Sequence, residues 1–416
     1  MKREFVLAFI VILFSIGAYA NTFGNEFVWD EKFFIQENIK IRSLSNVPDF
    51  FSQTDYDLYR PLRTTLYALN YSVWGQNPVG YHLNSLLWHA ASSVMLLLIL
   101  SMLIKHKIIP LAAAVIFAVH PIHTERVTNI TGGFDLLGIF LVLLTFYLYL
   151  LFSKKKNRNY LIAAAVTFIL ALFSSEEAFV LPLLMLLYEV VYGKLTFDVK
   201  KHKKQIQIIS IFVVLLIAFV VFRFFVIGLG AREDIYLTGS FFTTMLTMVK
   251  VFAHYGFLIF IPFPLTLYRE VGFVNILIDP VFLLSLLSLL VVMVAAVKYH
   301  KKYPLMAFSA GWFFITLLPF SNVLPLQTLM ADRYLYLPSV AGCVVFAFLI
   351  FRIPRRAIAV AVTLLLVLAF ITVTIERNVD WSDNLTLWEK TAKTSETTSV
   401  VFSNLGYSYE QDDRLI

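Results

Sequence analysis

Residues 134–152 read FDLLGIFLVLLTFYLYLLF, an apolar run whose charged residue is Asp135 near its start. A helix that crosses the hydrocarbon core of a bilayer needs about 20 consecutive apolar residues, and this run has that length. Lysines follow it directly at positions 154, 155 and 156. An apolar run of this length, closed by a cluster of lysines, predicts a transmembrane helix whose second end lies on the cytoplasmic side.

The whole chain has the composition of a membrane protein. Of its 416 residues, 59% are hydrophobic and 15% are charged, and the mean hydropathy is +0.77. Soluble globular domains carry about 25% charged residues. Helices satisfy their backbone hydrogen bonds internally, so we expect an all-α integral membrane protein. Eleven spans are predicted, near residues 5–20, 83–104, 108–119, 134–152, 160–174, 178–192, 206–228, 279–298, 304–319, 335–351 and 356–375.

Basic residues test this number of spans, because Lys and Arg are enriched in cytoplasmic connections. Residues 241–261 contain Lys250 and His254 and end at Pro262-Phe263-Pro264, so we expect them to be interfacial or re-entrant. Counting residues 241–261 as a span would place the last two basic clusters on the opposite side of the membrane from the others. Without them, one side receives all the clusters: Lys2/Arg3, Lys105/Lys107, Lys154/Lys155/Lys156 with Arg158, Lys200/Lys201/Lys203/Lys204, Lys298/Lys301/Lys302 and Arg352/Arg355/Arg356.

Two properties of the chain have a second interpretation. The net charge of +7 could suggest a nucleic-acid partner, but the basic residues lie in short clusters between spans, where they set orientation. The start, Met1-Lys2-Arg3 followed by an apolar stretch, also resembles a signal peptide, with Ala18-Tyr19-Ala20 as its cleavage site. We predict no nucleic-acid partner, and we interpret the first apolar stretch as a retained helix.

Most acidic residues fall on the side opposite the basic clusters. Asp30 and Glu31 are adjacent carboxylates in the long loop 21–82, close to the membrane surface. Carboxylates gathered where helices emerge are what an active site on this side would require. The alternatives are a solvated loop acid or a helix N-cap, for which Asp is a favoured residue. Asp30 and Glu31 are our candidate catalytic residues.

The C-terminal tail has the spacing of a known helical repeat. Phe402, Leu405, Gly406 and Tyr409 follow the opening pattern of a tetratricopeptide repeat, whose apolar positions line one face of its first helix. One repeat cannot bury its own apolar face, so the tail could be the head of a longer array. A coincidental amphipathic helix is the alternative. We divide the chain into a membrane domain, 1–378, and the start of a repeat region, 379–416.

Several short motifs follow one another along the chain. They are Phe27-Val28-Trp29-Asp30-Glu31, Tyr59-Arg60-Pro61-Leu62, the stretch 69–82 (LNYSVWGQNPVGYH), His120-Pro121-Ile122-His123-Thr124-Glu125, Ser175-Glu176, Asp332-Arg333-Tyr334-Leu335-Tyr336-Leu337-Pro338-Ser339 and Trp381. In this order they resemble the TMTC family of transmembrane, repeat-bearing O-mannosyltransferases, which are related to the GT-C membrane glycosyltransferases. Two positions differ from the family: residues 132–135 (GGFD) lack an arginine, and Ser175-Glu176 replaces the usual Lys-Glu.

The resemblance implies a GT-C type bundle and a definite chemistry. A hexose, implied to be mannose, would pass from a polyprenyl-phosphate donor in the membrane to a Ser or Thr hydroxyl of a protein, with inversion at C1. Asp30 would act as the general base, which contributes about 10²–10⁴-fold, and Glu31 would orient the acceptor or remain structural. A nucleotide cofactor is not expected, because the sequence has no glycine-rich phosphate loop and its cytoplasmic loops are short.

A leaving phosphate needs positive charge, and the arginines of the acidic side could supply it. A salt bridge with a neighbouring acid, such as Asp332, is the alternative for each. His120 and His123, with Glu125 or Asp30, could hold a divalent metal; the alternatives are contact with the donor and an internal hydrogen-bonded cluster. Glu176 and Glu177 could contact sugar hydroxyls or lie in a solvated turn. The candidate phosphate and substrate residues are Arg60, Arg63, His120, His123, Glu125, Arg126, Glu176, Arg269 and Arg333.

Two other classes of function are compatible with the sequence. A GT-C enzyme could glycosylate a lipid or a glycan, although a repeat-bearing tail favours a peptide acceptor. A transporter or a scaffold is the other class, but no paired Gly/Pro-broken spans mark a site at the membrane midplane. We predict a multi-pass protein of the bacterial inner membrane, with its active site and tail facing the periplasm and with membrane lipid around it.

Overall fold

The computed structural model describes residues 2–54, 58–193, 202–228, 236–395 and 398–411. The elements of secondary structure in these ranges are all helices, apart from an isolated bridge residue at Leu58. The membrane-protein prediction is confirmed, because seven of the described helices are long and apolar enough to cross a bilayer. The predicted basic positions Lys200 and Lys201 and the last residues of the tail, 412–416, lie outside the described part of the chain.

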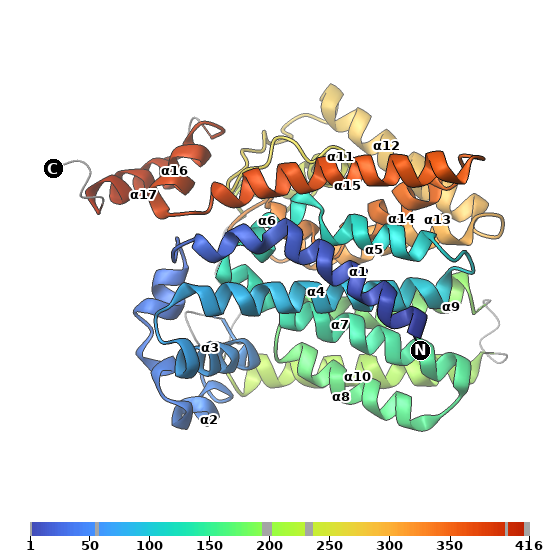
Figure 1. Ribbon diagram of the computed structural model, residues 1–416, viewed down its shortest axis with the longest axis horizontal. Helices are drawn as coiled ribbons and strands as arrows, with labels where there is room; N and C mark the ends of the chain where they lie inside the picture. The colour runs from blue at the N-terminus through green and yellow to red at the C-terminus, as the bar shows by residue number, and fades with distance from the viewer. Residues whose placement is uncertain (1, 55–57, 194–201, 229–235, 396–397, 412–416) are drawn as a thin grey trace.

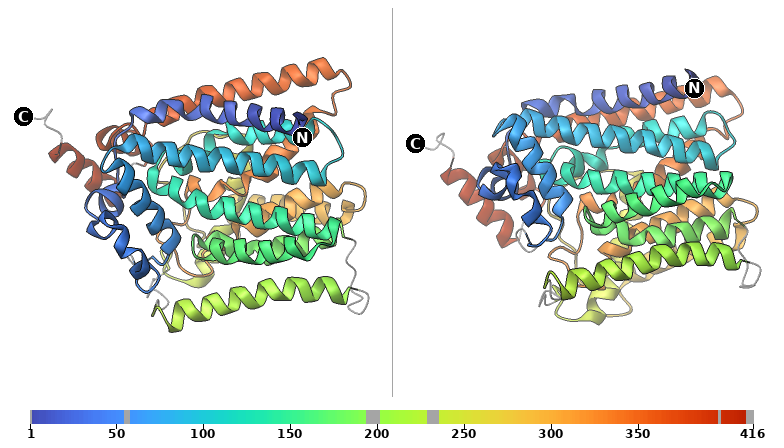
Figure 2. Two further views of the ribbon diagram at one scale, coloured as in Figure 1. Left: turned by 60° about the horizontal axis from the view of Figure 1, so that its bottom comes forward. Right: turned by 90° about the horizontal axis from the view of Figure 1, so that it is seen from below.

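Each of the eleven predicted spans corresponds to a helix. These helices run side by side as a bundle (Figures 1 and 2). Three of them, α4, α12 and α13, begin with proline at the first helical position, where the missing N–H has no intrahelical partner to lose. The eleven helices are α1 (Lys2–Tyr19), α4 (Pro78–Leu103), α5 (Ile109–Ala118), α7 (Ile130–Lys155), α8 (Arg158–Leu172), α9 (Leu181–Val191), α10 (Lys203–Phe225), α12 (Pro280–Tyr299), α13 (Pro304–Leu317), α14 (Ser339–Ile350) and α15 (Arg356–Val379).

The stretch predicted to be interfacial or re-entrant forms one continuous helix, α11 (Phe241–Phe260). By length and composition it counts among the seven candidate spans, which differs from the prediction. The residue Tyr236 before the helix and the last turn of the helix nevertheless contact the acidic side of the bundle. Just before the helix, Tyr236 Oη donates to the Val323 carbonyl, and near its end the Ile259 carbonyl lies 2.9 Å from His120 Nε2. Both partners belong to connections that the sequence placed opposite the basic clusters.

The two ends of the bundle differ in charge and in structure. The N-terminus lies at one end, together with the connections after α4, α7 and α14, which carry basic residues (Figure 1). The other end carries the first long loop, with α2 (Val47–Phe50) and α3 (Pro61–Trp74), and the tail helices α16 (Asn384–Ala392) and α17 (Ser399–Glu410). This segregation agrees with the predicted alternation of the spans.

Helices α4 and α7 approach each other closely at the acidic end. Gly133 lies in the first turn of α7, and a Cβ there would come 1.8 Å from Ser85 Oγ of α4. Only glycine permits this approach. Asn129 caps α7, its Oδ1 accepting from the Gly132 N–H at 2.9 Å. The start of α7 is therefore fixed against α4 at the acidic end.

The tail forms a pair of packed helices. Phe402, Leu405, Gly406 and Tyr409 all fall in α17, so the predicted helix is present. Its buried residues are Val401 and Ser408, whereas the Phe402 side chain is exposed. A helix pair is compatible with a tetratricopeptide repeat, and this assignment and the division of the chain at residue 378 stay predictions.

Candidate functional site

Asp30 lies at the acidic end of the bundle, in the turn that precedes residues Lys32–Gln36. Its side chain is half-buried, and its carboxylate makes no hydrogen bond or ion pair with any residue that the structure describes. Burial raises the pKa of Asp30 above its usual value, and the nearby charges of Arg333 and Arg63 oppose this effect. A carboxylate that is unpartnered and held close to cations is available to accept a proton.

Glu31 is fully buried, and both of its carboxyl oxygens are occupied. Oε2 accepts from the Val28 N–H at 2.7 Å, and Oε1 accepts from the Ile130 N–H at 2.5 Å. Burial raises the pKa of Glu31 to about 8, although these backbone donors favour the carboxylate. Glu31 therefore ties the first loop to the start of α7. These two hydrogen bonds are compatible with the structural one of the two predicted roles, and the role of Glu31 in catalysis stays a prediction.

Asp135 is the centre of a buried cluster of ion pairs. Arg60 Nη1 donates to both of its carboxylate oxygens at 2.9 Å, and Arg126 Nη1 donates at 3.0 Å. Arg63 Nη1 lies farther away, at 3.4 Å. The Nε atoms of Arg63 and Arg126 are buried without a hydrogen-bond partner among the described residues. Since such orphaned donors are rare in proteins, the cluster retains unused capacity for an anion.

Two glutamates extend this cluster toward α10. Glu176 pairs with Arg60 at 2.7 Å and with Arg223 at 2.8 Å, while Glu177 pairs with Arg126. Burial acts to raise the pKa of Glu176, but the guanidinium groups of Arg60 and Arg223 outweigh it and hold the value at about 2. The turn containing Glu176 and Glu177 is thus an ion-paired element, which differs from the solvated turn weighed as an alternative.

Arg333 and Arg269 form two further ion pairs on the same side. Arg333 Nη1 donates to Glu125 Oε1 at 2.5 Å, and the Arg333 backbone N–H donates to the other oxygen at 2.9 Å. Arg269 Nε donates to Asp332 at 2.8 Å. Arg333 also lies over the ring of Trp29, 6.0 Å from its centroid. Arg333 is therefore placed between the Asp30 loop and Glu125.

The two candidate histidines, His120 and His123, lie inside the bundle. His120 is fully buried, its Nδ1 accepts from the Ile122 N–H at 3.2 Å, and its Nε2 lies 2.9 Å from the Ile259 carbonyl. His123 Nε2 is 2.7 Å from Ser339 Oγ. Of the predicted alternatives, this arrangement matches the hydrogen-bonded cluster. Within the described ranges, no group of three or more His, Cys, Asp or Glu side chains is placed to hold a metal ion.

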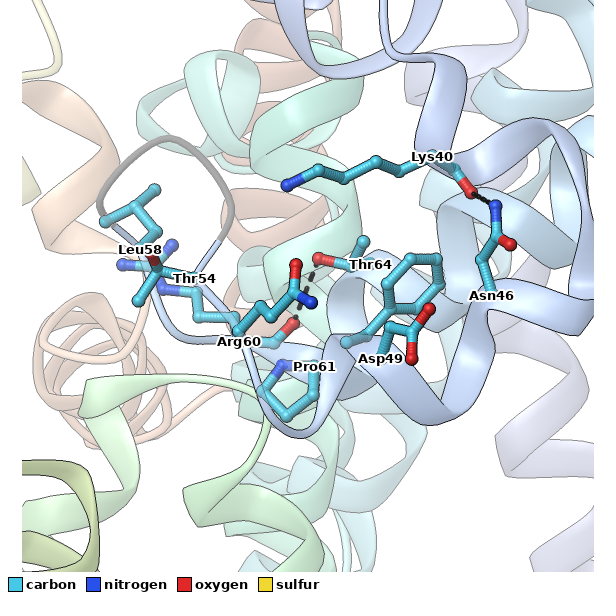
Figure 3. Close-up of a pocket in the computed structure, with 10 residues that line it drawn as sticks. Lys40, Asn46, Asp49, Thr54, Leu58, Arg60, Pro61 and Thr64 are labelled. Carbon is cyan, nitrogen blue, oxygen red and sulfur yellow. Dashed lines mark hydrogen bonds between the residues drawn. The ribbon is translucent and has the colours of Figure 1, made fainter. Parts of the chain in front are cut away.

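A small cavity of about 180 Å³ lies beside the arginine cluster around Asp135, between α2, the start of α3 and the segment that carries Lys40 (Figure 3). Arg60 and Thr64 line it, and Thr64 Oγ1 donates to the Arg60 carbonyl at 3.4 Å. Lys40 extends across the cavity, and its ammonium group makes no ion pair with a described residue. The cavity therefore adds the ammonium group of Lys40 to the cations near the arginine cluster.

The sequence gives little indication that Asp135, Arg223 and Lys40 belong to the site. Asp135 and Arg223 lie within predicted spans, and their pairing across helices is what places them in the site. Ionisable residues inside an apolar span are costly unless they are paired or functional, and this was the signal available. Lys40 carried no signal, because an exposed lysine in a polar loop is ordinary.

The fold and the site together define a polytopic, all-α membrane protein with a polar arginine and carboxylate site at one end of its bundle. The chain is 25% identical over 423 residues to the Caenorhabditis elegans protein named Protein O-mannosyl-transferase F38B6.6, covering 95% of this chain and 59% of that protein. It is 31% identical over 170 residues to Drosophila melanogaster Protein O-mannosyl-transferase Tmtc1, covering 38% of this chain and 20% of that protein. For human Protein O-mannosyl-transferase TMTC4 the identity is 30% over 169 residues, covering 35% and 23%.

These similarities confirm the resemblance to the TMTC family. The nematode relative, which matches almost the whole chain, is named a protein O-mannosyl-transferase, and the fly and human relatives, which match shorter stretches, carry the family's name. No family model matches the chain. The chain spans 59% of the length of the nematode relative, and about a fifth of the length of the fly and human relatives.

Proposed function

We propose that the chain is a membrane glycosyltransferase that moves a hexose from a polyprenyl-phosphate donor to a Ser or Thr hydroxyl of a protein. The names of the relatives support transfer of mannose to protein. The observation that carries the proposal is the environment of Asp30, whose half-buried carboxylate lies near Arg333 and Arg63 and has no hydrogen-bond or ion-pair partner in the described part of the chain. Base and anion-binding groups are thus adjacent at one end of the bundle.

The proposed reaction is a single displacement at C1 of the sugar. The acceptor oxygen forms a bond to C1 as the bond from C1 to the phosphate oxygen breaks, and the phosphate leaves with the electron pair. Asp30 takes the proton of the attacking hydroxyl. Attack from the face opposite the phosphate inverts the configuration. No protonated partner acid is required, because the phosphate is already a good leaving group.

The arginines divide into two groups in this proposal. Arg63 and Arg333 contact the leaving phosphate, because each is close enough to Asp30 to act on the charge of its carboxylate. Arg333 would exchange Glu125 for phosphate when the donor binds, since both partners suit its planar donor groups. Arg60 and Arg126 are more fully paired and hold Asp135, Glu176 and Glu177 in place. His120 and His123 support this region from inside the bundle.

The proposal also includes the side of the membrane on which the site lies and the role of the tail. The acidic end faces the periplasm of a bacterial inner membrane, and the tail, as the start of a repeat region, holds the protein acceptor. The basic connections at the opposite end support this orientation. A donor whose polyprenyl chain lies in the bilayer would present its phosphate at the depth where the helices end.

The test is a transfer assay with the purified full chain in lipid nanodiscs. The donors are radiolabelled mannose on polyprenyl phosphate, the same lipid carrying glucose, and GDP-mannose, each offered with a Ser/Thr peptide. We expect label in the peptide from the lipid-linked mannose and none from GDP-mannose. Label in the peptide from GDP-mannose would contradict the proposed donor. Label recovered only in lipid or glycan would show a different acceptor class.

A further inference from the structure

The tail helices contact the loop that carries Asp30. Trp29, directly before Asp30, has φ = +53°, a left-handed conformation that is unusual for a bulky residue. Its backbone N–H donates to Asn384 Oδ1 of α16 at 2.7 Å, and its ring lies edge-on to Trp388 at 6.1 Å between centroids. Such conformations persist only where the surroundings determine them. Here α16 provides the surroundings.

The contacts continue on both sides of Asp30. Before it, the Glu26 N–H donates to the Ser382 carbonyl at 2.8 Å. After it, Lys32 Nζ donates to Tyr407 Oη of α17 at 2.5 Å. Val28 is buried in one hydrophobic cluster with residues of the tail, namely Trp381, Leu387, Trp388 and Val401. The tail therefore holds the Asp30 loop over several residues by hydrogen bonds and by apolar packing.

The tail also contacts the segment that supports the arginines. Thr394 Oγ1 lies 2.7 Å from Thr266 Oγ1, and Ser395 Oγ donates to the Tyr268 carbonyl at 2.6 Å. The next residue, Arg269, pairs with Asp332, the neighbour of Arg333 in the chain. The same element thus contacts the loop of the base and the segment paired to the Arg333 region.

We infer that Asn384 is a positioning residue for Asp30, and that the tail is part of the catalytic unit in addition to any acceptor it binds. The side-chain oxygen of Asn384 fixes the Trp29 N–H, and the left-handed turn at Trp29 then sets the direction in which the Asp30 carboxylate approaches the acceptor hydroxyl. Asn384 itself touches no reacting atom. This inference rests on the proposed function, in which Asp30 is the base.

The experiment uses the full chain, produced in a host without N-glycosylation because Asn384-Leu385-Thr386 is a sequon. Asn384→Ala removes the acceptor oxygen, whereas Asn384→Asp keeps it. The matched control is Asn404→Ala, since Asn404 lies on α17 and, among the described residues, its amide donates to the Val400 carbonyl of its own helix alone. Initial rates of transfer from polyprenyl-phosphate mannose and thermal melting are measured for each.

We expect Asn384→Ala to lower kcat by about 10-fold to 10²-fold, the size of effect expected when a catalytic group is misplaced by about 1 Å. The KM for the lipid donor should not change, Asn384→Asp should restore kcat, and Asn404→Ala should resemble the wild type. The inference is overturned if Asn384→Ala keeps full kcat, if Asn384→Asp is as slow as Asn384→Ala, or if the whole loss is explained by a smaller folded fraction.

The outcome separates this inference from the proposed function. If Asn384→Ala is fully active and an Asp30→Asn variant is inactive, the positioning role fails and the base assignment stands. If both variants are fully active, the base assignment fails, and the positioning role fails with it.

Discussion

An Asp30→Asn variant is expected to lose glycosyl transfer by about 10²–10⁴-fold while it still folds and binds its donor. The amide has the size of the carboxylate but cannot accept the proton of the acceptor hydroxyl. Because the Asp30 carboxylate has no partner among the described residues, the substitution breaks no hydrogen bond or ion pair. The measurement is the initial rate of mannose transfer to a Ser/Thr peptide, together with binding of the lipid donor.

The control is Glu26→Gln, which makes the same chemical change at an exposed acid of the same loop. This variant should turn over at the wild-type rate. The wild-type rate should fall at acid pH, because Asp30 must be unprotonated to act and burial raises its pKa above that of an ordinary aspartate. Normal turnover by the Asp30→Asn variant would refute the assignment of the base.

Asp135→Asn is expected to have the largest effect on stability. It removes the carboxylate shared by Arg60, Arg63 and Arg126, and so leaves positive charge buried with less compensation. Breaking a buried ion pair by removing one partner costs about 3–5 kcal/mol of unfolding free energy. Thermal melting in detergent, followed by the loss of monodisperse protein, measures the change.

The comparison for this variant is Asp49→Asn. Asp49 is exposed and forms no ion pair with a described residue, so its replacement should change the unfolding free energy by less than about 0.5 kcal/mol. Equal melting temperatures for the two variants would show that the charges around Asp135 are dispensable for the fold.

The spans could be predicted from the sequence because they depend on local properties. The apolar run at 134–152 has the length that a bilayer requires, and the lysines after it give its direction. The structure places α7 there, beginning slightly earlier, at Ile130. The stretch 241–261 was harder to assign, because Lys250 and His254 suggested an interfacial segment while its length suits a span.

The site could be predicted only in part. Asp30 and the arginines were found, because charged residues near helix ends stand out in an apolar chain. Their partners could not be found, since the pairing of Arg60 with Asp135 or of Arg333 with Glu125 joins residues far apart in the sequence. The contact of Glu31 with the Ile130 N–H could not be predicted for the same reason, because Ile130 lies on another element.

The account depends most on Asp30 facing the side of the membrane opposite the basic connections. Its side chain is half-exposed, so a cysteine at this position can be labelled. In a Cys343→Ala background, we expect a membrane-impermeant maleimide to label the Asp30→Cys variant in intact cells, and the Lys107→Cys variant only after permeabilisation. Labelling at position 107 in intact cells, with position 30 reached only after permeabilisation, would contradict the account.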